Sequence, residues 1–242
     1  MIISLATRAT WPRGRTQLIH IVTAGFFMHT AYLGGVFVSI DLGLATGALA
    51  VITGIQPILT GVAVGPIFKE RVSFRQWVGL FLGFLGVSLV VWEKTTLEGT
   101  PIAAFIAAFI CLAAITIGTM YQKHFCADQD IRSLNAIQLA TSALTCGVIA
   151  ASVETGEIVW ANQLMFAISW QVIVLSVVAF SVFYWLLRQD QAIRVTSLFY
   201  LMPPTTALMG YFLFDETFAL LGLAGLFVAM AGFWTLISDK HA

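Results

Sequence analysis

The polar side chains that could do chemistry in this sequence are uncharged, and they recur at helical spacing inside long apolar runs. Thr53, Gln56 and Thr60 follow one another at intervals of three and four residues, beside Pro57. Side chains at these intervals lie on one face of a helix. Because amides and hydroxyls exchange hydrogen bonds without carrying charge at neutral pH, the pattern predicts a hydrogen-bonding surface.

Further polar faces occur in three other apolar runs. Their members are Gly25, His29, Tyr32 and Ser39 in the first, Asn135, Gln138, Ser142 and Thr145 in the second, and Ser181 with Tyr184 in the third. An amide without a partner in apolar surroundings is unfavourable, so these faces must meet one another or water. Hydrogen bonding between helices is the alternative for Ser and Thr, and simple packing is the alternative to titration for His29. For Gln56, beside a proline, we favour the lining of a wet cavity.

The sequence carries no motif of an enzyme, a metal site or a nucleotide-binding domain. It contains no GxxxxGK[ST], no GxGxxG after a strand and no HExxH. Cys111, Cys126 and Cys146 form no CxxC pair, and no Cys/His spacing suits zinc. We therefore expect no catalysis, no cofactor, no metal and no nucleic-acid partner. A membrane-embedded enzyme would require His29 to meet acidic groups in the folded chain.

Composition indicates that lipid surrounds these polar faces. Apolar residues make up 59% of the 242 residues and charged residues 10%, against roughly a quarter charged in ordinary soluble domains. A water-soluble fold of this length could not bury so much apolar surface. We expect an all-α membrane protein, folded as a polytopic helical bundle.

Eight apolar runs are long enough to cross ~30 Å of hydrocarbon as transmembrane helices. They cover residues 18–40, 44–68, 74–92, 101–122, 133–152, 168–187, 193–214 and 219–237. With eight spans, eleven of the twelve Lys and Arg residues fall on one side of the membrane, and Lys94 falls on the other. Because flanking positive charge marks the cytoplasmic side, both termini are expected to be cytoplasmic, with the protein in the cell inner membrane.

The segment from Ile55 to Gly86 occurs twice, with a shift of 146 positions and no gap. The shift pairs Pro57 with Pro203, Thr60 with Thr206, Glu70 with Glu216, Gly79 with Gly225 and Gly86 with Gly232. The two proline-bearing runs cross the predicted membrane in opposite directions, so the repeat is predicted to be inverted. Each proline should bend its helix. Three GxxxG pairs should permit close helix contact, namely Gly43 with Gly47, Gly61 with Gly65 and Gly79 with Gly83. The two glutamates lie at helix ends, where a structural role is the alternative to a role in coupling.

The first copy of this repeat resembles a known family. The resemblance is carried by Phe68-Lys69-Glu70-Arg71, by Gln76-Trp77-Val78-Gly79-Leu80 and by Gly83-Phe84-Leu85-Gly86-Val87. These residues resemble the EamA-type repeat of the drug/metabolite transporter superfamily, and the second copy, with Phe214-Asp215-Glu216, matches it less closely. The resemblance implies five helices per repeat. It divides the chain into a partial first repeat of three helices, residues 1–94, and a second repeat of five, residues 101–242. The first two family helices have no counterpart, which leaves open a misplaced start or a naturally shortened member.

The inverted repeat and the resemblance together imply a secondary transporter. Inverted repeats let a site at mid-membrane open alternately to each side, and the family exports amino acids, metabolites or drugs. The residues expected to line the substrate cavity are His29, Tyr32, Gln56, Pro57, Asn135, Gln138, Tyr184, Tyr200, Pro203 and Thr206. The expected partners are membrane lipid and a small organic solute, and the oligomeric state stays open. The alternative is a truncated family member that does not transport, or a subunit that needs a partner to complete the bundle.

Overall fold

The structure is a computed structural model, and it describes residues 9–92, 99–153, 160–189, 191–202, 205 and 220–238. Within these ranges the chain is helical and contains no strand. Six helices are long and apolar enough to cross a membrane, and they are Arg15–Asp41, Thr46–Phe68, Phe74–Val91, Ile102–Phe125, Ile131–Val153 and Asn162–Gln189. Two shorter apolar helices, Ala192–Leu201 and Leu221–Ile237, follow. The predicted all-α, polytopic membrane fold is therefore confirmed.

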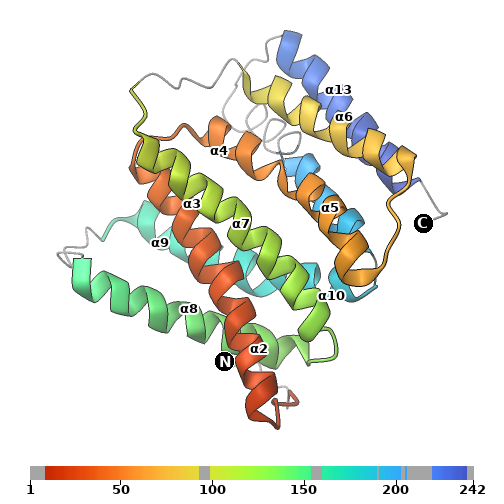
Figure 1. The fold of residues 1–242 in the computed structure, drawn as a ribbon. Helices are drawn as coiled ribbons and strands as arrows, with labels where there is room; N and C mark the ends of the chain where they lie inside the picture. Colours follow the sequence, from red (N-terminus) through yellow and green to blue (C-terminus); the bar gives the residue numbers. More distant parts are fainter. Residues whose placement is uncertain are drawn as a thin grey trace. The chain divides into compact units, whose positions relative to one another are not determined.

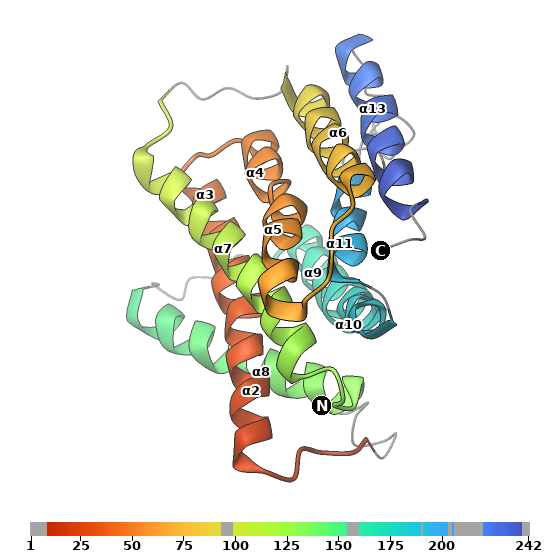
Figure 2. The same cartoon turned by 45° about the vertical axis from the view of Figure 1, so that its right-hand side comes forward.

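Several spans combine α-helix with π-helical or 3₁₀ turns, and Figures 1 and 2 label the α-helices along the chain. In chain order the elements are α2 (Arg15–Gly25), the π-helix η1 (Phe26–Ala31), α3 (Tyr32–Asp41), α4 (Thr46–Thr53), α5 (Gln56–Phe68), α6 (Phe74–Val91), α7 (Ile102–Phe125), α8 (Ile131–Val153), α9 (Asn162–Trp170), the π-helix η3 (Gln171–Ala179), α10 (Phe180–Gln189), α11 (Ala192–Ser197), the 3₁₀ turn η4 (Leu198–Leu201) and α13 (Leu220–Ile237). The π-helices matter below, because such segments recur at functional sites.

The ends of most spans agree with the sequence prediction to within three residues. The sixth span differs, because its helix begins at Asn162 and not at residue 168. The polar pair at its start lowers the local hydropathy without preventing helix formation, so hydropathy alone misplaced this end. Of the seventh span the structure describes only residues 191–202 and 205. Pro203, Thr206 and Glu216 lie outside the described residues.

Pro57 divides its span into two helices. α4 ends at Thr53, and α5 begins at Gln56, after a turn at Gly54 and Ile55. A proline nitrogen cannot donate to the carbonyl four residues earlier, here that of Thr53, so the ladder of hydrogen bonds stops there. Pro57 then occupies the first turn of α5, where no donor is needed. The predicted bend is thus a break that lies before the proline.

The start of α6 is fixed by a capping box at Ser73. The Gln76 backbone nitrogen donates to Ser73 Oγ at 3.1 Å, and the Ser73 backbone nitrogen donates to Gln76 Oε1 at 3.0 Å. These two bonds satisfy donors that the first helical turn leaves without partners. They position the glycine-bearing face of α6 described below.

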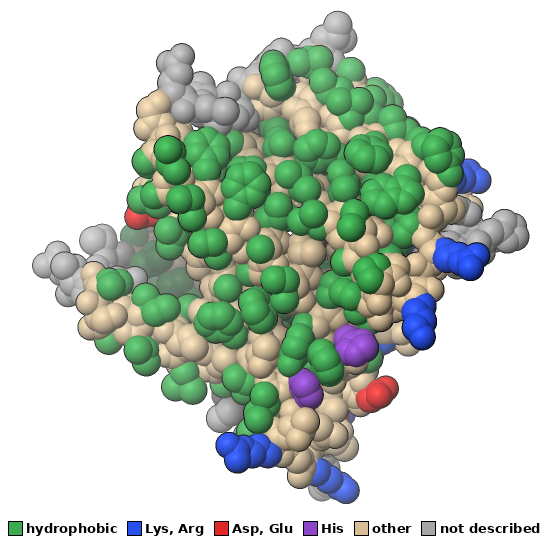
Figure 3. Space-filling model, in the orientation of Figure 1, with side chains coloured by type: hydrophobic (Ala, Val, Ile, Leu, Met, Phe, Trp, Pro, Cys, Tyr) green, Lys and Arg blue, Asp and Glu red, His purple; other side chains and the backbone are tan. Residues whose placement is uncertain are grey.

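Contacts divide the chain into two compact units. Unit 1 comprises Met1–Gly34 and Ile117–Asp190, and unit 2 comprises Gly35–Thr116 and Gln191–Ala242. Both carry large apolar side chains on their surface, including Val148 at 71% and Phe166 at 70% exposure in unit 1 and Phe227 at 73% in unit 2. Figure 3 shows apolar side chains spread over the face that it draws. Such surface suits contact with lipid.

Candidate functional site

Unit 1 encloses a continuous chain of four hydrogen-bonded side chains. His29 Nε2 lies 2.9 Å from the Tyr184 hydroxyl, which donates to Gln138 Oε1 at 2.6 Å. Gln138 Nε2 in turn donates to Gln122 Oε1 at 2.7 Å. The four residues come from η1, α10, α8 and α7, and each is at most 3% exposed. The arrangement is a buried polar chain without a formal charge, here called the His29 chain.

Close helix packing brings this chain together. A Cβ atom on Gly25 would lie 2.7 Å from the Cα of Gln138, so the absence of a side chain allows α2 to approach α8. His29 follows four residues later, within η1, and its ring lies 4.3 Å from that of Phe180 between ring centroids. Thr30 Oγ1 forms a second link to α8, at 2.8 Å from Thr145 Oγ1. The sequence at Gly25 therefore controls where His29 meets its partners.

Asn135 lies one turn before Gln138 on α8 and contacts the same span as Tyr184. Its Nδ2 donates to the Ser176 carbonyl at 2.9 Å and to Ser181 Oγ at 3.3 Å. Ser176 belongs to the π-helix η3, where its own hydroxyl donates to the carbonyl of Gln171, five residues earlier, at 3.0 Å. Asn135 is 5% exposed. Asn135 thus adds a second polar contact between α8 and α10, one turn away from the contact of Gln138 with Tyr184.

Unit 2 buries the polar face predicted around the first proline. Gln56 is 1% exposed and Thr60 0%, and Pro57 is buried between them on α5. Tyr200, on η4, is likewise fully buried, and its ring packs on α6, where a Cβ atom added at Gly83 would lie 2.3 Å from Tyr200 Cδ2. Among the described residues no hydrogen bond reaches the hydroxyl of Thr60 or of Tyr200.

The glycines of the repeat join α6 to α13, which lie side by side in Figures 1 and 2. A Cβ atom on Gly79 would lie 2.8 Å from the Gly232 carbonyl oxygen, and a Cβ atom on Gly225 would lie 2.8 Å from the Gly86 carbonyl oxygen. A Cβ atom on Gly86 would lie 2.2 Å from the Ala229 nitrogen. Residue numbers fall along α13 as they rise along α6, so the two helices run antiparallel. The close helix contact predicted for Gly79 and Gly83 is present in unit 2, and Gly86, Gly225 and Gly232 extend it.

The structure brings some predicted site residues together and leaves others apart. His29, Gln138 and Tyr184 form one hydrogen-bonded chain, with Asn135 one turn away. Tyr32 is half-buried on α3, beyond the π-helix. The remaining described candidates, Gln56, Pro57 and Tyr200, belong to unit 2.

Sequence reasoning missed Gln122, which ends the His29 chain. The predicted helix stopped at this residue, whereas α7 continues to Phe125 and places Gln122 inside the span. Thr116, Thr119 and Gln122 recur at intervals of three and are all buried. That spacing is the signal that could have identified the polar face of α7.

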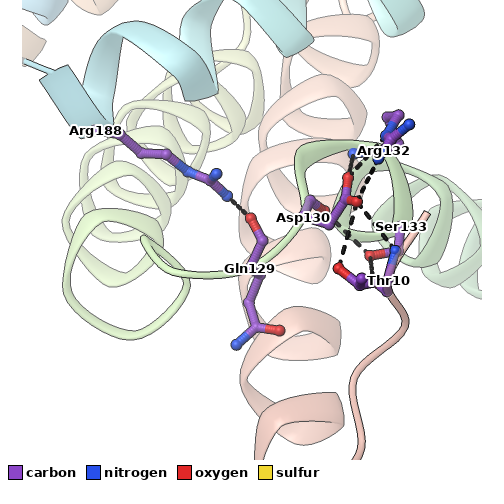
Figure 4. A network of polar contacts seen from close by, with 6 residues as sticks. All are labelled: Thr10, Gln129, Asp130, Arg132, Ser133 and Arg188. Atoms are coloured by element: carbon purple, nitrogen blue, oxygen red, sulfur yellow. Dashed lines mark hydrogen bonds and ion pairs between the residues drawn. The ribbon is translucent and has the colours of Figure 1, made fainter.

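A second polar network surrounds the loop between α7 and α8 (Figure 4). Asp130 accepts hydrogen bonds from the Thr10 nitrogen at 3.0 Å and from the Arg132 nitrogen at 2.9 Å, and it forms an ion pair with Arg132 at 2.8 Å. The hydrogen bond from the Arg132 side chain, with these backbone bonds, holds the pKa of Asp130 well below its usual range. Arg188 donates to the carbonyl of Gln129 in the same loop. The network attaches the N-terminal segment to the start of α8.

No group of three or more His, Cys, Asp and Glu side chains in the described part of the chain could hold a metal ion. Burial raises the pKa of the Cys126 thiol, in the loop after α7, to about 11, which disfavours the reactive thiolate. The buried side chains of the His29 chain can bind by hydrogen bonding.

Comparison with known proteins points to one family. The sequence pattern of the family described as "EamA-like transporter family" matches residues 102–238. The curated protein sequences compared with this chain contain no match. A solved structure described only as "Crystal structure of protein" has a TM-score of 0.79 and 15% sequence identity, covering 100% of this chain and 83% of that chain. At this identity the likeness concerns the fold alone.

Proposed function

Because this chain belongs to the EamA-like transporter family, we propose that it moves a small organic solute across the membrane by alternating access. The chain is a multi-pass membrane transporter of the drug/metabolite transporter superfamily. Members of this family are generally not enzymes. The cell inner membrane, cytoplasmic termini and export of the solute are parts of the proposal, and the distribution of Lys and Arg supports the orientation.

The observation that carries the proposal is the reciprocal contact between α6 and α13. Under the shift of 146 positions Gly79 corresponds to Gly225 and Gly86 to Gly232. The contacts of Gly79 with Gly232 and of Gly86 with Gly225 are therefore the same contact made twice. Each helix thus uses the same two repeat positions to contact the other helix. This reciprocity is characteristic of two elements related by a two-fold axis.

This symmetry supports an inverted repeat, because corresponding helices run antiparallel across it. In an inverted repeat the two halves can exchange conformations and so expose a site first to one side of the membrane and then to the other. The broken span at Pro57 lies in the first copy, beside buried neutral groups at Gln56 and Thr60. A break of this kind is tolerated at membrane depth where protein or a wet cavity satisfies the freed backbone.

The proposal assigns solute binding to uncharged groups that are buried or, for Tyr32, half-buried. The described candidates are His29, Tyr32, Asn135, Gln138 and Tyr184 on one set of spans and Gln56, Pro57 and Tyr200 on the other. Charged side chains are rare within the spans, so hydrogen bonding and shape would select the solute.

Flux into reconstituted vesicles tests this function. The full chain is placed in proteoliposomes, and uptake and efflux are measured for a panel of labelled amino acids and related metabolites. Saturable flux of at least one solute, absent from protein-free vesicles, is expected. The absence of protein-dependent flux for the whole panel, from correctly inserted chain, would reject transport and favour a subunit that requires a partner.

A further inference from the structure

Four rings form a contiguous cluster at one end of unit 1, where α2 starts and α7 ends. They belong to His20 on α2 and to Tyr121, His124 and Phe125 on α7. The His20 imidazole stacks on the Phe125 ring, with centroids 4.4 Å apart and an angle of 6° between the ring planes. The Phe125 ring also lies 4.6 Å from that of Tyr121 and 4.5 Å from that of His124. These four residues, here called the His20 cluster, take no part in the His29 chain.

One nitrogen atom of His20 is engaged in the cluster and the other is available. His20 Nδ1 lies 2.7 Å from the Tyr121 hydroxyl, which has no other hydrogen-bond partner among the described residues. The hydroxyl can therefore donate to Nδ1, which places the imidazole hydrogen on Nε2. No hydrogen bond from a described residue reaches Nε2. The stack and the hydrogen bond thus hold a half-buried imidazole in one orientation, with an N–H donor left over.

The His20 cluster lies where the apolar surface of unit 1 ends. Ile19 on α2 and Ile117 and Phe125 on α7 are each about half exposed. Ile117 lies one turn before Tyr121, and α7 ends at Phe125, where the loop to α8 begins. Figure 3 shows two histidine side chains close together beside apolar side chains. Aromatic side chains at such a boundary are typical of the level of the lipid headgroups.

Basic side chains prevail at this end of unit 1. The last turn of α7 carries Lys123 and His124. The charged side chains described at the adjoining helix ends and loop are Arg13, Arg15, Lys123, Arg132 and Arg188, against Asp128 and Asp130. Asp130 is already paired with Arg132, at 2.8 Å. An excess of basic residues beside a membrane attracts the anionic lipids of the cytoplasmic leaflet.

The chemistry of the cluster selects a phosphate group that carries acyl chains. The outward groups are the Nε2–H of His20 and the ammonium of Lys123, and unesterified phosphate oxygens accept hydrogen bonds from both. Acyl chains of the same molecule would cover Ile19 and Ile117, whose removal from water is favourable. A free phosphate would gain nothing from that apolar surface. A metal ion would find no third His, Cys, Asp or Glu ligand in the described part of the chain.

We propose that the His20 cluster binds the phosphate of an anionic phospholipid, in the leaflet that is cytoplasmic under the orientation proposed above. His20 Nε2 donates to a phosphate oxygen, and Lys123 supplies positive charge. Tyr121 and Phe125 hold the imidazole in place. The site is separate from solute binding, so the lipid would be a bound partner of the chain whether or not the chain transports a solute.

The test measures displacement of a fluorescent phosphatidylglycerol from the full chain in micelles of a neutral detergent. Unlabelled phosphatidylglycerol, phosphatidylcholine and inorganic phosphate are the competitors. Phosphatidylglycerol should compete at least about fivefold better than phosphatidylcholine, because the choline cation offsets an attraction worth roughly that factor for each basic residue. Inorganic phosphate should not compete. Equal competition by phosphatidylcholine, displacement by inorganic phosphate, or the absence of saturable binding would each overturn the proposal.

His20→Phe removes Nε2 and keeps a flat ring that can stack on Phe125. The affinity for phosphatidylglycerol should fall about tenfold, as expected for the loss of a hydrogen bond to a charged group. Arg15→Gln is the matched control, because it removes a full charge from the same helix outside the cluster, and its loss of affinity should be smaller. Unchanged affinity in His20→Phe, or a larger loss in Arg15→Gln, would indicate general charge attraction and overturn the assignment. If His20→Phe does not fold, the competition between lipids on the unaltered chain still decides the question.

Discussion

Adding one methyl group at Gly86 tests the crossing of α6 and α13. In Gly86→Ala the new Cβ atom would lie 2.2 Å from the Ala229 nitrogen and 2.6 Å from its Cα, whereas ordinary contact begins at 3.4 Å. Because the opposing atoms are backbone, the helices must separate locally by about 1 Å. Overpacking of this kind costs ~1–3 kcal/mol, a factor of about 5 to 150 in the ratio of folded to unfolded protein.

The matched control is Gly222→Ala on α13, where an added Cβ atom meets nothing within 4 Å. Alanine favours helix over glycine by up to ~1 kcal/mol, so this variant should be as stable as the original or more stable. Gly232→Ala, the repeat equivalent of Gly86→Ala, meets the Gly83 nitrogen at 2.3 Å and should lose a similar amount. Unfolding by denaturing detergent in mixed micelles measures all three variants. Equal stability of Gly86→Ala and Gly222→Ala would refute the close crossing.

The remaining predictions concern the two polar networks and the buried tyrosine of unit 2. Tyr184→Phe removes a hydroxyl with two buried partners and should lower stability by ~1–3 kcal/mol in the same unfolding assay; a neutral effect would contradict the His29 chain. Asp130 has a lowered pKa, so its ionised form stabilises the fold above the usual carboxyl range, and this contribution is lost as pH falls through the folded pKa. The stability advantage of the original chain over Asp130→Asn should thus be full at pH 7 and shrink below about pH 4, and a difference independent of pH would contradict the network. Tyr200→Phe removes a hydroxyl that no described residue binds and should leave stability unchanged or raised; a loss above ~1 kcal/mol would indicate a missed partner.

The positions of the spans were accessible from sequence because each helix must carry about 20 apolar residues to cross the hydrocarbon. The polar faces of the helices were also accessible, since His29, Gln138 and Tyr184 each belong to a set of polar residues at helical spacing, and their side chains are hydrogen-bonded to one another. The close helix contact at Gly79 and Gly83 was predictable from their GxxxG spacing, whereas α13 as the partner of Gly79 was not. These features depend on local pattern and solvent, which a sequence displays directly.

Other features depend on long-range packing and were not predictable. The π-helices η1 and η3 rotate the side chains that follow them about the helix axis, relative to a regular α-helix. The residue spacing around His29 and Ser176 does not predict these π-helices. The choice of Gln122 as the partner of Gln138 depends on where α7 ends, which hydropathy placed three residues too early. The break before Pro57 has a local cause, the hydrogen bond that the proline nitrogen cannot donate to the Thr53 carbonyl, and the sequence predicted it as a bend.

Counterflow through proteoliposomes tests alternating access most directly. Vesicles containing the full chain are loaded with an excess of the unlabelled solute that gives the largest flux, and a trace of labelled solute is added outside. A carrier whose single site opens alternately to each side should accumulate the label transiently above its external concentration and then release it. Label that only approaches the external concentration, at a rate unaffected by the internal solute, would contradict alternating access.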